Sequence, residues 1–282
     1  MSVDLAKKEM PIGQPEPSGV EQHRNRTNDR YLLWIALFSI IFFIFALQQL
    51  DFDYGRLISG TRELPLMAVK MFPPNFSEWE DVLRSVAETF QMTWAATLLS
   101  VVVAFVLSFF CAANTAPSRW MFWFLRGFAA LMRAIPVLVW AIIFVAALGL
   151  GPLPGVLALA IHSLGMMIKV FSDSIEEVDQ RVLEAMRAAG AGWLQMIVRG
   201  VLPLVYTSFM SWALLRFDID LRYATVLGMV GAGGIGWQLI RSMHMYELHD
   251  ALFIVMVMFA MLYTVEMMSN FIKKRMINAN GL

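Results

Sequence analysis

Long stretches without a charged residue constrain this chain more than any other feature. Tyr31–Leu50 (YLLWIALFSIIFFIFALQQL) and Phe90–Ala113 carry no charge, and no Asp, Glu, Lys or Arg occurs from Ala134 to Ile168. A helix needs about 20 apolar residues to cross the hydrocarbon of a bilayer. Because 59% of the residues are hydrophobic and only 16% are charged, a core of this size cannot hide them all. The pattern predicts an all-α integral membrane protein.

We predict about six transmembrane helices. The run from Ala134 to Ile168 is too long for one crossing, and Gly149–Gly155 (GLGPLPG) divides it, since prolines and glycines disfavour a continuous helix. The predicted spans are Tyr31–Leu50, Phe90–Ala113, Trp120–Leu148, Val156–Val170, Gly200–Leu215 and Ala251–Ile272. By domain, the prediction is a polar tail (1–30), the first span (31–50), an outer segment (51–84), a core of five helices (85–272) and a second tail (273–282).

The distribution of basic residues predicts the orientation. With both termini in the cytoplasm, 13 basic residues fall on inner segments and seven on outer ones. This bias agrees with the positive-inside rule. We therefore expect a multi-pass membrane protein with both termini and its inner segments in the cytoplasm.

Composition argues against several other classes of protein. The 22 basic and 22 acidic residues balance, which disfavours a nucleic-acid binder that works by bulk attraction. A lone cysteine, Cys111, cannot form a disulfide framework. We expect no bound metal and no catalytic site, because no nucleophile and base are convincingly arranged and the histidines are scattered, at His23, His162, His244 and His249.

A polar interruption from Asp173 to Arg199 falls on the predicted inner side. Apolar residues repeat there at helical spacing on both sides of Gly190-Ala191-Gly192. This pattern predicts two short helices, over about 174–199, that meet at a glycine and form a protrusion that a partner protein could grip. An amphipathic loop lying on lipid remains the alternative interpretation.

A glycine-rich block follows the predicted fifth span. Its members are Gly231, Gly233, Gly234 and Gly236. They allow backbone geometry that other residues cannot adopt. We interpret the block as a close-packed bend beside a translocation path, and plain helix–helix packing is the alternative. A nucleotide-binding loop would require a Lys-Ser/Thr pair, which is absent here.

Charged residues near the predicted spans are candidates for the path. Arg133 lies within the third span, one turn before Pro136. A second cluster falls where the predicted fifth span ends, and contains Arg216, Asp218, Asp220 and Arg222. The arginines could attract an anionic substrate, or they could simply pair with the aspartates at the outer interface.

The inner segment resembles the cytoplasmic signature (EAA motif) of ABC importer membrane subunits. That signature reads Glu-Ala-Ala, three residues, Gly, nine residues, Ile-x-Leu-Pro. Here Glu184, Ala185 and Gly190 match, as do Leu202 and Pro203, while Met186 replaces an alanine and Gly200 the isoleucine. The resemblance implies a type I importer permease core whose coupling helices, with Glu184, Ala185, Met186 and Gly190, fit a groove on an ATPase.

A second block is similar to phosphonate-type (PhnE-like) permeases of the same MetI-like superfamily. It runs from Arg216 to Gly236 (RFDIDLRYATVLGMVGAGGIG), and Arg133–Pro136 adds to the likeness. The resemblance implies import of a small phosphorus oxyanion of the phosphonate, phosphite or hypophosphite class. A permease for another solute such as methionine is the alternative, and an ion-coupled secondary transporter is a further one.

The same resemblance implies the location and the partners: the chain would lie in the bacterial inner membrane, with its outer segments in the periplasm. This chain has no Walker A motif, so ATP and Mg²⁺ would bind a separate ATPase subunit, present in two copies. One set of six spans is half of a path, which implies a homodimer. A periplasmic substrate-binding protein would deliver the solute, and the chain itself would bind no cofactor.

Overall fold

The computed structural model describes residues 26–50 and 53–279, and the described part contains helices and no strand. The chain divides into two units, Met1–Leu64 and Pro65–Leu282. In the first unit, α1 (Arg26–Gln49) contains the predicted first span. Most of the polar tail predicted over 1–30 lies outside the described residues. Helix α2 (Tyr54–Lys70) begins in this unit and occupies much of the predicted outer segment.

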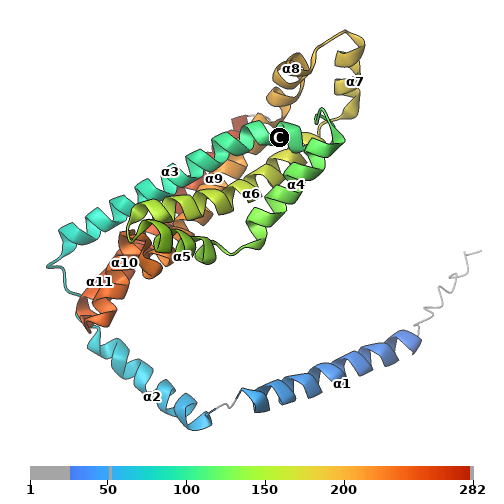
Figure 1. The fold of residues 1–282 in the computed structure, drawn as a ribbon. Helices are drawn as coiled ribbons and strands as arrows, with labels where there is room; N and C mark the ends of the chain where they lie inside the picture. The colour runs from blue at the N-terminus through green and yellow to red at the C-terminus, as the bar shows by residue number, and fades with distance from the viewer. Residues whose placement is uncertain (1–25, 51–52, 280–282) are drawn as a thin grey trace, which may run out of the picture. The chain divides into compact units, whose positions relative to one another are not determined.

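The second unit is a helix bundle with short helices at both of its ends (Figure 1). Helices α7 and α8 lie at one end, and α10 lies at the other. Helix α11 continues into the predicted C-terminal tail. The long helices are α3 (Trp79–Cys111), α4 (Arg119–Ala134), α5 (Val137–Leu148), α6 (Pro152–Glu176), α9 (Leu202–Leu227) and α11 (Leu248–Ala279), and the short ones are α7 (Gln180–Ala188), α8 (Trp193–Gln195) and α10 (Gly234–His244).

The predicted all-α membrane fold is confirmed, with one span built differently. Within residues 26–50 and 53–279, five helical segments are long and apolar enough to cross a membrane, and α4 with α5 makes a sixth if that pair counts as one span. The prediction of a single helix over Trp120–Leu148 is wrong, because α4 and α5 meet at an angle of 83°. Ile135 is extended there (φ −87°, ψ 120°), as a residue before proline prefers, and Pro136 has no N–H to continue α4.

Two predicted helix ends also need correction. The break at Gly149–Gly155 is shorter than predicted, since Pro152 and Pro154 lie in the first turn of α6, where a proline loses no helical hydrogen bond. The predicted fifth span ends at Leu215, but α9 continues to Leu227. The charged residues from Arg216 to Arg222 therefore lie inside α9 and not beyond its end. Ion pairs within the bundle stabilise these charges, which composition alone would place at the membrane surface.

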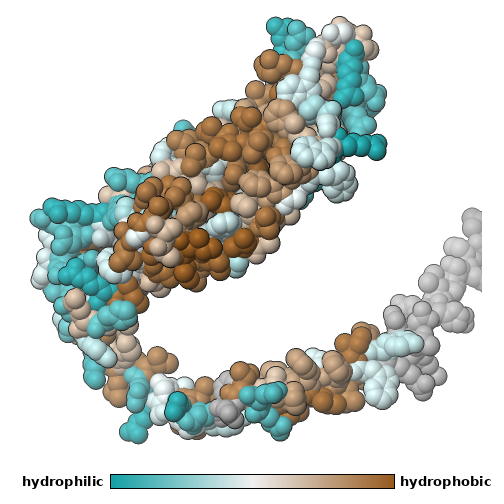
Figure 2. Space-filling view, viewed as in Figure 1, coloured by the Kyte–Doolittle hydropathy of each residue, from teal (hydrophilic) through white to brown (hydrophobic). Residues whose placement is uncertain are grey.

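Helix α6 lies at the centre of the bundle and packs against α3, α4, α5 and α9. A Cβ atom at Gly165 would lie 2.8 Å from the Ala129 carbonyl oxygen, so the glycine allows α4 to approach α6 closely. Figure 2 shows apolar residues over the middle of this bundle and hydrophilic ones gathered at its two ends. A bundle of this kind matches a bilayer, with the α7 end on one side and the α10 end on the other.

Candidate functional site

Helix α7 is a short helix that is capped at both ends. Asp179 precedes it, and its side chain accepts a hydrogen bond from the Arg181 N–H at 2.9 Å. The Arg181 side chain also donates to this carboxylate, and these bonds lower the pKa of Asp179 below its usual value. Gly190 ends the helix with φ +81°, and the N–H groups of Gly190 and Ala191 bond to Arg187 and Met186 in a Schellman motif.

The helix that carries the predicted coupling residues, α7, is shorter than the predicted range 174–199. Glu176 ends α6, and α7 begins only at Gln180. On α7, Leu183 is buried in the bundle, whereas Glu184 and Ala185 are exposed. The second predicted piece is not a separate helix, because α8 continues through a π-helical turn (Met196–Val201) into α9. Three residues connect α6 to α7, and α8 is continuous with α9.

The two departures from the importer signature lie in contact with each other. A Cβ atom at Gly200 would overlap the sulfur of Met186, and the three heavy atoms nearest to that position all belong to Met186. A larger residue at 186 thus fills the space that a smaller residue leaves at 200. The pair preserves the packing of α7 against the π-helical turn, which the sequence comparison alone left open.

A pair of substitutions tests this compensation. Gly200→Ile should destabilise the α7 region by about 1–3 kcal/mol, because a branched side chain would enter space that Met186 fills. Met186→Ala combined with Gly200→Ile should recover most of that loss, since it restores the residue types of the signature. The amount of folded protein and its melting temperature in detergent measure both, with Met186→Ala alone as the control. A Gly200→Ile protein as stable as the parent would contradict the compensation.

The turn between α3 and α4 accepts hydrogen bonds from residues on both sides of the Gly190 bend. The Trp193 indole N–H donates to the Thr115 carbonyl at 2.7 Å, and Arg187 donates to the Asn114 carbonyl at 3.2 Å. Asn114 in turn donates to the carbonyl of Ile175, near the end of α6, at 2.7 Å. The turn thus connects the ends of α3 and α6 to both sides of the Gly190 bend.

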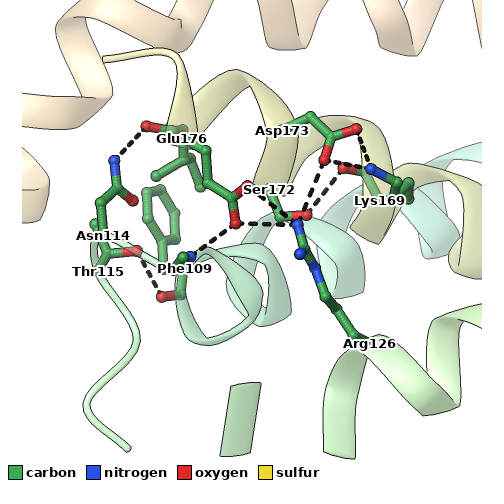
Figure 3. Close-up of polar contacts among 10 residues, drawn as sticks. Phe109, Asn114, Thr115, Arg126, Lys169, Ser172, Asp173 and Glu176 are labelled. Atoms are coloured by element: carbon green, nitrogen blue, oxygen red, sulfur yellow. Dashed lines mark hydrogen bonds and ion pairs between the residues drawn. The ribbon is translucent and has the colours of Figure 1, made fainter. Parts of the chain in front are cut away.

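An ion-pair cluster lies directly beside this turn (Figure 3). Arg126 of α4 donates to both oxygens of Glu176 at 3.1 Å and lies 3.7 Å from Asp173, which also pairs with Lys169. Glu176 accepts a further bond from the Ala113 N–H at 2.8 Å. Our sequence interpretation did not include this cluster. The signal for it was a charged Arg126 within an apolar predicted span, together with the helical spacing of Lys169, Asp173 and Glu176.

The glycine-rich block forms both a bend and a close contact. Gly231, Gly233 and Gly234 have φ values of 94°, 80° and 70°, which favour glycine. The Gly231 carbonyl accepts from the N–H of Gly151, so this bend pairs with the break before α6. A Cβ atom at Gly236 would overlap the Thr225 carbonyl oxygen, so α10 lies directly against α9. The block therefore forms both a bend and a helix–helix contact, and its place beside a translocation path stays a prediction.

A buried polar network joins α3, α6 and α9. Arg216 and Asp220 of α9 are 2% and 0% exposed, and Arg216 Nη2 lies 2.7 Å from Asp220 Oδ1 in an ion pair without hydrogen-bond geometry. Ser163 of α6 donates to Asp220 at 2.7 Å and accepts from Arg216 Nε at 2.9 Å. Thr97 of α3 donates to the other carboxylate oxygen of Asp220 at 3.0 Å. Every charge in the network is paired inside the protein.

The other predicted path residues are not part of this network. Arg222 pairs with Asp218 at 3.3 Å and with Glu266 of α11 at 2.8 Å. The charged cluster predicted from sequence is therefore two separate groups, and Asp220 pairs with Arg216 rather than Arg222. Arg133, at the end of α4, is exposed. Within the described residues, no cluster of three His, Cys, Asp or Glu side chains could hold a metal ion.

Two known permease proteins are similar to this chain in sequence. The chain is 40% identical over 222 residues to the phosphite transport system permease protein PtxC of Stutzerimonas stutzeri, a match that covers 79% of this chain and 81% of that protein. It is 36% identical over 209 residues to the phosphate-import permease protein PhnE of Mycolicibacterium smegmatis, covering 74% of this chain and 39% of that longer protein.

Solved structures show the same fold. A chain of the inward-facing methionine ABC transporter MetNI is similar with a TM-score of 0.60 at 18% identity, covering 69% of this chain and 95% of that one.

Residues 104–278 match the model of a protein family described as the binding-protein-dependent transport system inner membrane component. That match includes α7, the glycine-rich bend, and Ser163, Arg216 and Asp220 of the buried polar network, whereas Thr97 lies outside the match. The chain belongs to the family of binding-protein-dependent transport system inner membrane components, the permeases of ABC importers.

Proposed function

We propose that this chain is the permease subunit of an ATP-driven importer that carries a small phosphorus oxyanion from the periplasm to the cytoplasm. The 40% identity to a phosphite permease over about four fifths of both chains is the observation that carries the proposal. The likeness to a methionine transporter is one of fold at 18% identity, so it does not favour methionine as the solute. Phosphonate, phosphite and hypophosphite share the tetrahedral oxyanion that such a path would accept.

The exposed face of α7 is the proposed contact with the ATPase. Glu184 and Ala185 lie on it, Met186 packs beneath it, and Gly190 sets the turn that follows. Two copies of an ATPase would bind ATP and Mg²⁺ and hydrolyse the nucleotide, so this chain performs no catalysis. Closure of the ATPases would shift the permease between inward- and outward-open states by binding one of them better.

The proposed orientation puts the α7 end in the cytoplasm. Basic residues concentrate at this end of the bundle, in agreement with the positive-inside rule, and include Lys169, Arg181, Arg187, Arg199, Lys273 and Lys274. Both termini would then be cytoplasmic. A periplasmic binding protein would dock at the opposite end, where α10 and the glycine-rich bend lie beside the proposed path.

A second permease chain, as in a homodimer, would complete the path. The Arg222–Glu266 ion pair supports this arrangement, because the two side chains are 46% and 52% exposed on helices that cross the membrane. Charged side chains that face the lipid hydrocarbon are costly. Water in a path or a neighbouring permease chain would cover them.

Growth and uptake on single phosphorus sources test the substrate class. Deletion of the gene should abolish growth on phosphite or a phosphonate at low concentration, while growth on another phosphorus source continues. Reintroduction of the gene should restore it. Unchanged uptake of every phosphorus oxyanion after deletion, together with impaired uptake of methionine, would reject the proposed substrate class.

A further inference from the structure

The three arginines that sequence marks as candidates for the path differ in whether their charge is available. Arg216 is enclosed with Asp220 inside the bundle. Arg222 lies between two carboxylates, Asp218 and Glu266, so that cluster has one more negative than positive charge. Neither arginine presents net positive charge to an approaching anion. Their positions agree with a structural role.

Arg133 is different, because no carboxylate neutralises it. Arg133 is exposed, and its guanidinium makes no ion pair or hydrogen bond within the described residues. The base of its side chain lies on α6, where a Cβ atom at Gly165 would be 3.1 Å from Arg133 Cγ. The side chain therefore starts from a fixed point on the bundle and ends in a free charge.

The depth of Arg133 in the bundle makes a free charge informative. Helix α4 begins at Arg119 near the α7 end, and Arg133 lies about 21 Å along it at 1.5 Å per residue. The hydrocarbon of a bilayer is about 30 Å thick, so this position is well inside it. An unpaired guanidinium at that depth is costly against lipid and normally faces a water-filled cavity.

Other polar groups lie on α4, which carries Arg133, and on α6, which its side chain contacts. Arg126 and Arg133 are seven residues apart and so share a face of α4, and Arg126 points to Asp173 and Glu176 of α6. Further along α6, His162 is half-buried, and its ring contacts Tyr223 of α9 edge-on at 5.8 Å. Nδ1 of His162 has no hydrogen-bond partner among the described residues.

We propose that Arg133 faces the translocation path and is the cation of this chain that attracts the oxyanion, whereas Arg216 and Arg222 hold the bundle together. This inference rests on the proposed function and names the residue that serves it. A guanidinium can donate two parallel hydrogen bonds to two oxygens of a phosphorus oxyanion. Arg133 is the second residue before the break at Ile135, after which α5 turns away from α4 by 83°.

Uptake of radiolabelled phosphite by cells that express the permease with its ATPase and binding protein tests the proposal. Arg133→Gln should lower uptake about tenfold or more, since a charge-assisted hydrogen bond contributes at least that factor. Arg133→Lys should keep a substantial part of the uptake because it retains the charge. Arg62→Gln, which removes an exposed arginine of α2, is the matched control and should transport like the parent.

A second readout separates a role in the path from a structural role. In reconstituted membranes, the Arg133→Gln complex should keep its abundance and its ATP hydrolysis stimulated by the phosphite-loaded binding protein. Parent-level uptake in Arg133→Gln, or a loss of assembled complex in that variant, would overturn the role of Arg133 while leaving the proposed function standing. Absence of phosphite and phosphonate uptake by the parent protein itself would instead reject the proposed function, and this inference with it.

Discussion

Asp220→Ala should remove most of the folded permease from the membrane. Arg216 would remain buried without its carboxylate, and breaking a buried ion pair typically costs about 3–5 kcal/mol. That amount is a large fraction of the about 5–15 kcal/mol that stabilises a typical folded domain. Ser163 and Thr97 would also lose their acceptor, which adds to the loss. Membrane abundance and the melting temperature of the solubilised protein measure the effect.

A double-mutant cycle identifies the cause of that loss. Arg216→Met with Asp220→Leu removes both charges and keeps the volume, so most of the folded protein should return. The matched control is Arg222→Gln with Asp220→Ala, a pair that lies in two separate groups, and here the losses should add. Recovery of folded protein in the Arg222→Gln with Asp220→Ala variant would contradict the pairing of Asp220 with Arg216 in the buried polar network. So would no recovery in the Arg216→Met with Asp220→Leu variant. If the Arg216 pair restores abundance, the network serves stability.

Ala185→Asp should uncouple the importer while leaving the permease folded. Ala185 is exposed on α7, so the new carboxylate faces water until an ATPase covers it. Once covered, an unpaired charge at a packed contact costs several kcal/mol, which corresponds to a loss of more than about a hundredfold in binding. Stimulation of ATP hydrolysis by the loaded binding protein should fall to its basal level, together with uptake.

The controls for this prediction come from the same chain. Ala68→Asp adds the same charge at an exposed position of α2 and should leave coupling unchanged. Gly190→Pro should uncouple as well, because φ at this position is +81° and proline requires about −65°. Parent-level stimulation and uptake in both Ala185→Asp and Gly190→Pro would exclude α7 as the contact with the ATPase.

The sequence predicted the spans well because a run of uncharged residues is a local property. It missed the start of α6 because prolines in a first turn do not interrupt a helix. It missed the end of α9 because Arg216 and Asp220 resemble an interfacial cluster until their partners are known. Their spacing of four residues was visible, but Ser163 and Thr97 come from distant helices and no local pattern connects them. The Ile135–Pro136 break has a local cause that our prediction of one span overlooked.

The candidate site was predictable to a similar extent. Gly190 and the glycine-rich bend were found because a positive φ restricts the residue type, which leaves a mark in the sequence. The contact between Met186 and Gly200 was not, since two apolar departures from a signature look independent until they are seen to touch. The Arg126–Glu176 cluster was missed for the same reason, because its members lie on different helices.

Transport in a defined membrane tests the central claim most directly. The permease would be reconstituted into vesicles with its ATPase and binding protein, with ATP supplied on the side of the α7 end and radiolabelled phosphite on the other. We predict accumulation of phosphite that requires ATP, the loaded binding protein and an ATPase able to hydrolyse ATP. Accumulation that continues without ATP hydrolysis, or no accumulation of any phosphorus oxyanion by the complete assembly, would contradict the account.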